Sequence, residues 1–281
     1  MMMKDKTVLI TGSTDGVGRM VAEKLGANGA YVLVHGRDRE RGEQVLSQIA
    51  ASGGKADLCI ADLSSLAEVC RLAGIVKAKT DKLDVLINNA GIGTGPSGSK
   101  RQTSADGYEL RFAVNYLAGF LLTSLLLPLL ERSAPSRIVN VASAGQHPID
   151  FTDVMLTRHY DGVRAYCQSK LAQIIFTLDL AGELQGTGVT VNSLHPASYM
   201  ATTMVRQAGV TPWSTVEEGA EAILNLATSP ALEGRSGLYF NGTTESRADP
   251  QAYDVEAQQR LRALSLDLTG SSSEHQTSVL R

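Results

Sequence analysis

Short, mostly apolar runs rich in β-branched residues alternate with longer segments of helical spacing, and this alternation constrains the fold of the chain most strongly. The runs are TVLIT from Thr7, AYVLV from Ala30, ADLCIA from Ala56, DVLIN from Asp84, RIVNVA from Arg137, VTVNSL from Val189 and GLYF from Gly237. Their apolar residues are consecutive rather than alternating with polar ones. This pattern is typical of strands that are covered on both faces.

Segments with helical spacing separate the runs, at 17–28, 39–51, 66–79, 104–130, 164–184 and 216–228. Parallel strands need a crossover between them, and a helix that packs back onto the sheet supplies it. We therefore expect one doubly wound α/β (Rossmann) domain over residues 1–268, with about seven parallel strands and helices on both faces. The polar residues 269–281 are expected to form a disordered tail.

The charge balance argues against a polyanionic partner. The 281 residues include 26 Lys and Arg against 29 Asp and Glu, a net charge of -3, and no long basic run occurs. Such a chain offers no electrostatic footprint for a nucleic acid. The three cysteines, Cys59, Cys70 and Cys167, lack metal-ligand spacing and fit reduced thiols. We expect no metal site and, because the N-terminus MMMKDKTVLI is charged, a cytoplasmic location.

The segment from Phe112 to Leu130 contains no charged residue and approaches the length of a membrane span. Polar residues and Pro128 interrupt it, and charged residues flank both ends. Because it also lies between two strand-like runs, we expect a helix that is buried between the sheet and a neighbouring subunit.

Two long irregular stretches follow predicted strands, at 144–164 and 195–215. Open α/β sheets bind their ligands at the carboxyl ends of the strands. We expect the second stretch to be a substrate lid rather than a variable surface loop, with an apolar wall made of Tyr199, Met200, Met204 and Trp213.

The first run leads into TGSTDGVG, in which Gly12, Gly16 and Gly18 open the following helical segment. Glycines permit a tight turn and a close approach of backbone amides to a pyrophosphate, which the positive end of the helix favours. A strand before the loop, a helix after it and a second strand end about twenty residues later complete the context of a dinucleotide site.

The end of the second run, HGRD, bears on the choice of dinucleotide. NAD enzymes usually place a carboxylate there for the ribose hydroxyls, whereas Gly36 has no side chain and Arg37 offers a guanidinium to a 2′-phosphate. We expect NADP to be the cofactor, with NAD less favoured. Asp38 is expected to cap the next helix rather than bind ribose.

Tyr166 and Lys170 lie one helical turn apart in AYCQSK, so they share one face of a predicted helix. Alone, the pair is compatible with simple packing at a helix edge. A phenol with a pKa of about 10 is a poor base at neutral pH. A neighbouring ammonium favours the phenolate and lowers that pKa, so the pair is a candidate for acid/base catalysis.

These residues together resemble the short-chain dehydrogenases/reductases. The resemblance extends from Thr7 to Phe240 and is carried, in order, by TGSTDGVG, Asp62, NNAG at 88–91, Asn115, Ser143, Tyr166 and Lys170. The segments TSADGYELRFAVNYLAGFLLT and AYCQSKLAQIIFTLDL are similar to the retinol dehydrogenase and WW-domain oxidoreductase branch. We expect this chain to lack the WW domain and the membrane anchor of that branch.

The resemblance implies four catalytic residues. Tyr166 would exchange a proton with the substrate oxygen while a hydride moves to or from the nicotinamide. Lys170 would lower the pKa of the phenol and hold the nicotinamide ribose. Ser143 would hydrogen-bond the substrate oxygen, and Asn115 would position a water that relays protons to Lys170.

The resemblance also implies a cofactor site. The pyrophosphate and adjacent ribose would lie on the glycine-rich loop, the adenine against the residues after the third strand, and the other ribose against the NNAG segment. The residues expected to contact the cofactor are Gly12, Ser13, Thr14, Asp15, Gly16, Val17, Gly18, Arg37, Asp62, Leu63, Asn89, Ala90, Gly91, Tyr166 and Lys170.

Four residues depart from the family pattern or need a separate interpretation. Ala197 follows Pro196 where the family often has glycine, and the candidate nicotinamide contact Thr202 lies one residue later than expected. His195 lacks a partner carboxylate or nucleophile at a suitable spacing, so we interpret it as structural. Cys167 points to a different helix face from Tyr166 and is interpreted as a packing residue.

The sequence therefore predicts an NADP-dependent oxidoreductase that interconverts a carbonyl and an alcohol, with an apolar, medium-sized substrate. A nucleotide-sensing regulator without chemistry and a non-redox lyase or cyclase are the alternatives. Because family members commonly pair through their two long central helices, the resemblance implies a homodimer or a homotetramer. We expect no nucleic acid and no membrane among the partners.

Overall fold

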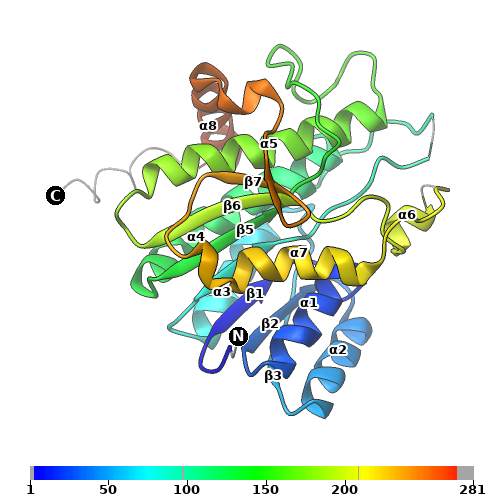
Figure 1. Cartoon of the computed structure of the whole chain (residues 1–281). Coiled ribbons are helices and arrows are strands. Elements are labelled where there is room, and N and C mark those ends of the chain that lie inside the picture. The colour runs from blue at the N-terminus through cyan, green and yellow to red at the C-terminus, as the bar shows by residue number, and fades with distance from the viewer. Residues whose placement is uncertain (1–2, 97, 208, 271–281) are drawn as a thin grey trace.

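The computed structural model describes residues 3–96, 98–207 and 209–270 and contains one central sheet (Figure 1). Its strand order is β3-β2-β1-β4-β5-β6-β7-β8. Strands β1 to β7 pair in parallel, and β8 pairs antiparallel with β7. The strands are β1 (Thr7–Ile10), β2 (Tyr31–Gly36), β3 (Lys55–Ile60), β4 (Val85–Asn88), β5 (Ser136–Val141), β6 (Val189–His195), β7 (Leu238–Asn241) and β8 (Thr244–Ser246).

Helices cover both faces of the sheet. One face is packed by α1 (Gly16–Ala27), α2 (Arg39–Ala51) and α7 (Val216–Thr228), the other by α3 (Leu66–Lys79), α4 (Ala118–Arg132) and α5 (Gly162–Glu183). Two separate clusters of buried apolar residues fill these layers, which is the expected consequence of strands that are apolar on both faces. The remaining elements are η1 (Phe112–Leu117), α6 (Thr203–Gln207), η2 (Pro230–Leu232), η3 (Pro250–Tyr253) and α8 (Val255–Thr269).

The predicted doubly wound α/β fold is confirmed, and each of the seven predicted strands is present. The chain reverses its direction of sheet growth between β1 and β4, because β2 and β3 lie on one side of β1 and all later strands lie on the other. This is the switch point at which such sheets bind ligands. The edge strand β8 was not expected, since TES is only three residues long and largely exposed.

The helix predicted at 104–130 begins later than expected. Thr103 and Glu109 form a β-bridge, Gly107 has a φ of 87°, and the Ser104 hydroxyl accepts from the amides of Asp106 and Tyr108. These local bonds hold the segment in a turn. The helix then contains a π-helical segment, η1, before continuing as α4.

The charge-free segment is part of the protein core. The combined helix from Phe112 to Arg132 is the one helix among the described residues that is long and apolar enough to cross a membrane. Most of it is buried, and Leu121, Leu122 and Leu126 belong to a core cluster. Its apolar character is therefore accounted for by packing against α3, α5 and the sheet.

Helix α8 was not anticipated from the sequence, and it packs against α5 and, through Ser265, against η1 (Figure 1). The Arg262 guanidinium forms ion pairs with Asp179, at 2.7 Å from Nε to Oδ2, and with Glu183, both on α5. Tyr116 in η1 shares a 2.6 Å hydrogen bond with Ser265. Pairing of subunits through the part of α5 and η1 that α8 covers would therefore require α8 to move.

Helix α8 ends at Thr269, one residue inside the predicted tail. The remainder of that tail, from 271 onward, lies outside the described residues. The predicted boundary was slightly early because the alternating polar residues of α8 carry only a weak helical signal.

Candidate active site

The predicted catalytic residues meet at the carboxyl ends of the central strands. Ser143 follows β5, Asn115 lies in η1, and Tyr166 and Lys170 lie on α5. Helix α5 begins cleanly because the Asp161 side chain accepts from the Arg164 amide at 2.7 Å. The first turns of the helix thus present both residues toward the end of β5.

Lys170 and Tyr166 are neighbours on α5, as their spacing predicted. The distance from Lys170 Nζ to the centroid of the Tyr166 ring is 5.8 Å. Nζ donates to the carbonyl of Val141 at 2.9 Å and to Gln173 Oε1 at 2.8 Å. Lys170 is buried, so these two neutral acceptors are the groups that compensate its lost hydration.

The expected lowering of the Tyr166 pKa is wrong for the protein by itself. Burial raises the Tyr166 pKa, the hydrogen bond with Ser143 opposes that rise, and Cys167 and Tyr199 add to it. Burial also lowers the Lys170 pKa from 10.5 to about 7. Desolvation penalises the charged form of each group and is the largest cause of both shifts.

Ser143 is held beside Tyr166 by the turn after β5. Its hydroxyl accepts from the Gly145 amide at 3.0 Å, and its carbonyl accepts from the Tyr239 hydroxyl at 3.1 Å. A Cβ atom at Gly145 would lie 3.5 Å from Ser143 Oγ, 3.8 Å from Tyr166 Cε1 and 3.4 Å from Cys167 Sγ. Three side chains therefore converge on this glycine.

Cys167 belongs to the packing around that turn. Burial raises the pKa of its thiol, so the thiol stays protonated at neutral pH. This agrees with its interpretation as a packing residue.

Asn115 ties the NNAG segment to α5. Its Oδ1 accepts from the Ile92 amide at 2.7 Å, and its Nδ2 donates to the Ile92 carbonyl at 3.1 Å and to Ser169 Oγ at 2.9 Å. The π-helical geometry of η1 accompanies this placement, as is frequent at functional sites. Both Nδ2 protons are used in these bonds, Oδ1 accepts one of the two bonds that it can accept, and the relay water remains a prediction.

Gly91 brings Asn115 and Lys170 to one point. A Cβ atom there would lie 3.3 Å from Asn115 Oδ1 and 3.4 Å from Lys170 Nζ. The backbone of the NNAG segment thus lines the same space as the catalytic lysine.

The glycine-rich loop and the NNAG segment together form a cradle. Residues larger than glycine at Gly12 or Gly18 would collide with atoms of this cradle. Gly12 has a φ of 65°, and a Cβ atom there would lie 2.8 Å from Ala90 Cα. A Cβ atom at Gly18 would lie 2.4 Å from both Asn89 Nδ2 and the Gly12 carbonyl oxygen. Asn89 donates to the carbonyls of Thr11 and Gly12, at 2.9 and 3.0 Å. The loop and the NNAG segment are therefore packed as one unit, and they fit a dinucleotide.

The helix after this loop starts at the expected place. The Asp15 side chain accepts from the Gly16 amide at 2.8 Å and caps α1, while Val17 lies in its first turn. The positive end of α1 thus faces the cradle, where it favours an anionic group.

Ser13 has a different role from the one predicted. It is fully buried; its hydroxyl donates to the Ile10 carbonyl at 2.8 Å and accepts from the His35 amide at 2.9 Å. Its own amide donates to the His35 carbonyl at 2.9 Å. Ser13 therefore fastens the loop to β2, and neither its hydroxyl nor its amide is available to a cofactor.

Thr14 occupies the space that a side chain at position 36 would need. A Cβ atom at Gly36 would lie 2.5 Å from Thr14 Cγ2 and 2.6 Å from Thr14 Oγ1. A side chain such as a carboxylate could be accommodated at this strand end only if the Thr14 side chain moved.

Two arginines flank that strand end. Arg37 lies 3.8 Å from Asp62, and Arg41, which the sequence analysis missed, lies 3.6 Å from Asp15 and 3.5 Å from Asp38. Asp38 caps α2 by accepting from the Arg41 amide at 3.1 Å, so its predicted capping role is confirmed. Arg41 could have been found from its position one turn into α2, beside the predicted phosphate loop.

The residues predicted against the adenine follow β3. Asp62 accepts from the Ser64 amide at 2.9 Å, and Leu63 is buried in a core cluster. Asp62 therefore shapes the turn at this edge of the site, opposite Arg37.

The stretch at 195–215 lies across the cradle and contains the short helix α6. A Cβ atom at Gly16 would lie 3.3 Å from Thr202 Cγ2, and one at Gly93 would lie 3.0 Å from Met204 Cγ. Thr202 thus lies over the glycine-rich loop despite its shifted sequence position. Met200 instead packs inward, where its sulfur would lie 2.2 Å from a Cβ at Gly219.

Tyr199 and Trp213 form an exposed aromatic pair on this stretch. Their ring centroids are 4.9 Å apart in an edge-to-face arrangement, and the Trp213 amide donates to the Tyr199 carbonyl at 3.1 Å. Both rings remain accessible. Of the four residues expected to form an apolar wall, these two and Met204 face outward near the cradle.

His195 is structural, as interpreted from the sequence. Its Nε2 lies 3.0 Å from Ser198 Oγ, and burial together with the nearby Lys170 charge lowers its pKa. No metal site accompanies it: the described residues 3–96, 98–207 and 209–270 contain no cluster of three His, Cys, Asp or Glu side chains suited to a metal.

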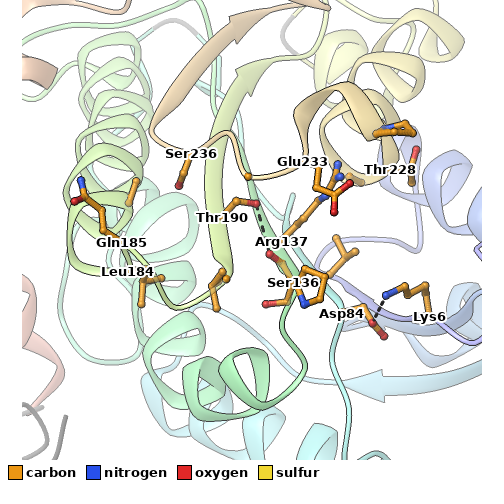
Figure 2. A pocket seen from close by; sticks show the side chains of 18 of the residues that line it. Lys6, Asp84, Ser136, Arg137, Leu184, Gln185, Thr190, Thr228, Glu233 and Ser236 are labelled. Atoms are coloured by element: carbon orange, nitrogen blue, oxygen red, sulfur yellow. Dashed lines mark hydrogen bonds and ion pairs between the residues drawn. The ribbon is translucent and has the colours of Figure 1, made fainter.

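A cavity of about 750 Å³ opens at the opposite, amino-terminal edge of the sheet (Figure 2). Lys6 and Asp84 form a 2.8 Å ion pair on its wall. Arg137 donates to the carbonyls of Leu226, in the last turn of α7, and Ser229, which follows that helix. None of the residues that line this cavity belongs to the predicted site, so it is a separate feature.

Comparisons with known proteins agree with this geometry. Residues 6–212 match the family model for short chain dehydrogenase. Human retinol dehydrogenase 13 is 38% identical over 94% of this chain and 85% of its own length. The crystal structure of an uncharacterized protein from Mycobacterium paratuberculosis superposes with a TM-score of 0.78, at 29% identity over 95% of this chain and 94% of the other.

A third similar protein is RhlG from Pseudomonas aeruginosa, solved as an active-site complex with NADP. It has a TM-score of 0.69 and 30% identity over 85% of this chain and 94% of its own. The chain belongs to the short-chain dehydrogenase family. It is an NAD(P)-dependent oxidoreductase that interconverts a carbonyl and an alcohol.

Proposed function

We propose that the protein uses NADP(H) to interconvert an apolar, medium-sized aldehyde or ketone and the corresponding alcohol. The observation that carries this proposal is the convergence of Ser143, Tyr166 and Lys170 beside the glycine-rich cradle. A regulator without chemistry would not need this set of residues, and neither it nor a lyase has a specific observation in its favour.

The chemistry divides between the cofactor and the chain. A nicotinamide dinucleotide held by the glycine-rich loop and the NNAG segment would supply or accept the hydride. The hydroxyls of Ser143 and Tyr166 bind the substrate oxygen, and Tyr166 gives it a proton during reduction. The positive charge of Lys170, 5.8 Å from the ring centroid, stabilises the phenolate that remains.

Gly36 and its surroundings support NADP over NAD. Gly36 carries no carboxylate to hold ribose hydroxyls, and the Thr14 side chain occupies the space that a side chain at this position would need. Arg37 and Arg41 place two exposed guanidinium groups at the same strand end, and each forms only long ion pairs of 3.5 to 3.8 Å. Such groups suit a 2′-phosphate, which bidentate guanidinium contacts recognise well.

The outward-facing part of the stretch at 195–215 supports an apolar substrate. Tyr199, Met204 and Trp213 offer exposed apolar surface, and Tyr199 lies close enough to Tyr166 to contribute to its raised pKa. Retinol dehydrogenase 13 is named for an apolar alcohol, which is the same chemical class. We propose that this stretch closes over the substrate as a lid.

Assembly and location are part of the proposal. Helix α8 covers one side of α5, so we propose that a homodimer or homotetramer would form through surfaces that α8 leaves open. Burial of the charge-free helix in the core supports a cytoplasmic protein without a membrane partner.

The test is a panel of apolar aldehydes, ketones and alcohols, retinal and retinol included, assayed by nicotinamide absorbance with both cofactors. We expect turnover with NADPH or NADP and an apolar member of the panel. Conversion of a panel member without cofactor consumption would instead support a lyase, and binding of NADPH with no conversion would support a regulator.

A further inference from the structure

We propose that His35 is a positioning residue for the cofactor site: its neutral ring joins the glycine-rich loop to the end of β3 and holds that loop in its binding conformation. His35 is not among the residues that the glycine-rich motif or the family resemblance places in the cofactor site. The inference rests on the proposed dinucleotide site and is independent of the substrate.

Both ring nitrogens of His35 are used, and each bonds a different part of the cradle. The Gly12 amide donates to Nδ1 at 3.1 Å, and Nε2 lies 3.2 Å from the Ala61 carbonyl oxygen. An amide can only donate and a carbonyl can only accept, so Nδ1 carries no proton and Nε2 carries one. The geometry therefore specifies a single neutral tautomer.

The backbone of His35 forms two hydrogen bonds with Ser13, the loop residue that follows Gly12. The His35 carbonyl accepts from the Ser13 amide, and the His35 amide donates to the Ser13 hydroxyl, both at 2.9 Å. Consecutive loop residues, Gly12 and Ser13, are thus fixed by one residue of β2.

The other side of Gly12 is fixed as well. Its carbonyl accepts from Asn89 Nδ2 at 3.0 Å, and its φ of 65° belongs to the left-handed region. Without the bond to His35, the Gly12 amide would be a part-buried donor without this partner, and unpaired donors are costly where water has limited access. The turn at Gly12 is therefore held from both sides.

His35 also connects the two ends of the predicted cofactor site. Ala61 immediately precedes Asp62 and Leu63, which are predicted to lie against the adenine, while Gly12 begins the loop predicted for the pyrophosphate. One imidazole thus sets the spacing between them. His35 is buried, and burial lowers its pKa to about 4, so the ring is neutral at neutral pH.

The test measures equilibrium binding of NADP and NADPH by titration calorimetry for three variants. His35→Leu removes both ring bonds, and we expect about tenfold weaker binding, the order expected for hydrogen bonds that organise a site. His35→Asn places an oxygen near the Nδ1 position and should recover affinity to within about threefold of wild type. The matched control is Val32→Ala, another buried residue of β2, which should lower the melting temperature without changing affinity.

A measurement on the wild-type protein keeps the proposal testable if a variant does not fold. Nitrogen-15 NMR of the histidine rings should show His35 as the tautomer protonated at Nε2 at neutral pH. Wild-type affinity in His35→Leu, equal losses in His35→Leu and His35→Asn, or a ring protonated at Nδ1 would each overturn the proposal. Absence of turnover on every substrate would sink the proposed function and leave these binding results unaffected.

Discussion

Lys170 Nζ lies 5.8 Å from the centroid of the Tyr166 ring, but its hydrogen bonds run elsewhere, to the Val141 carbonyl at 2.9 Å and to Gln173 Oε1 at 2.8 Å. The ammonium is therefore close enough to stabilise a phenolate by its charge without being the hydrogen-bond partner of the phenol. Proton transfer and electrostatic stabilisation are thus assigned to two different residues, which makes them separable by mutation.

Tyr166→Phe should lower turnover by about 10² to 10⁴, because it removes the general acid and keeps the ring packing. Cofactor affinity should change little, since the phenylalanine ring still fills the space beside Ser143 and Gly145. Single-turnover reduction and cofactor titration measure the two effects separately. The matched control is Tyr253→Phe, an exposed tyrosine on η3 far along the chain from the site, which should retain full turnover. A Tyr166→Phe enzyme within about threefold of wild type would exclude the mechanism.

Gln173 should control the pH range of activity through Lys170. Burial places the Lys170 pKa at about 7, so we expect turnover to decline as pH rises through that value and the ammonium loses its proton. Gln173→Glu puts a carboxylate next to Nζ, which raises the Lys170 pKa and should move the decline to higher pH. Gln173→Leu removes an acceptor from the buried ammonium, which lowers the Lys170 pKa and should move the decline in turnover to lower pH.

The pH dependence of turnover at saturating substrate, measured for the three proteins, checks this prediction. The two variants must shift the decline in opposite directions. Identical profiles would show that the contact between Gln173 and Lys170 has no influence on the reaction, and a common downward shift would indicate a general structural defect instead.

The catalytic set was predictable because its members sit on regular elements. A spacing of four residues on a helix fixed the relation of Tyr166 to Lys170, and the strand order brought Ser143 and the NNAG segment to the same sheet edge. Gly12 and Gly18 were recognisable because a glycine-rich loop between a strand and a helix has few uses. These inferences depend only on local geometry and on parallel sheet topology.

The residues that sequence reasoning missed act through tertiary contacts. In the sequence, His35 is indistinguishable from the other residues of its strand. Its bonds to Gly12 and Ala61 exist only because β1, β2 and β3 are neighbours in the folded sheet. For the same reason Ser13 looked like a cofactor contact, although its hydroxyl faces β2. The predicted lowering of the Tyr166 pKa was wrong because burial raises that pKa, and the extent of burial cannot be inferred from the position of Lys170 in the sequence.

Arg37 and Arg41 should determine the preference for NADPH. Arg37→Ala should weaken NADPH binding by about 1.5 to 3 kcal/mol, the value for a hydrogen bond to a charged group, and leave NADH binding almost unchanged. Arg41→Ala should act in the same direction, because Arg41 flanks the same strand end. Titrations with both cofactors measure these effects. Arg39→Ala on the exposed start of α2 is the control, and equal affinity of the wild type for NADH and NADPH would contradict the assignment.

Release of α8 should uncover an apolar face and cause self-association. Arg262→Glu replaces the ion pairs to Asp179 and Glu183 with repulsion, so α8 should dissociate from α5 more readily. We expect faster hydrogen exchange in α8 and a larger average mass by light scattering. Gln259→Glu introduces the same carboxylate at an exposed position of α8 and should do neither. A wild-type dimer cross-linked through α4 and α5 would contradict the covering role of α8.

Lys170→Met should make protein stability less dependent on pH while abolishing most turnover. The folded-state pKa of Lys170 is lowered from 10.5 to about 7, so between these values the unfolded chain binds more protons than the folded one. The destabilisation by Lys170 is therefore absent above about pH 10.5, increases as pH falls, and is complete below about pH 7. The methionine variant lacks this contribution, although it leaves the Val141 carbonyl without its donor at every pH. Urea unfolding at several pH values between about 6 and about 9 should thus show the variant gaining relative to wild type as pH falls. A difference in unfolding free energy that stays constant across this range would show that the Lys170 pKa is not lowered, and the pH dependence predicted for turnover would fall with it.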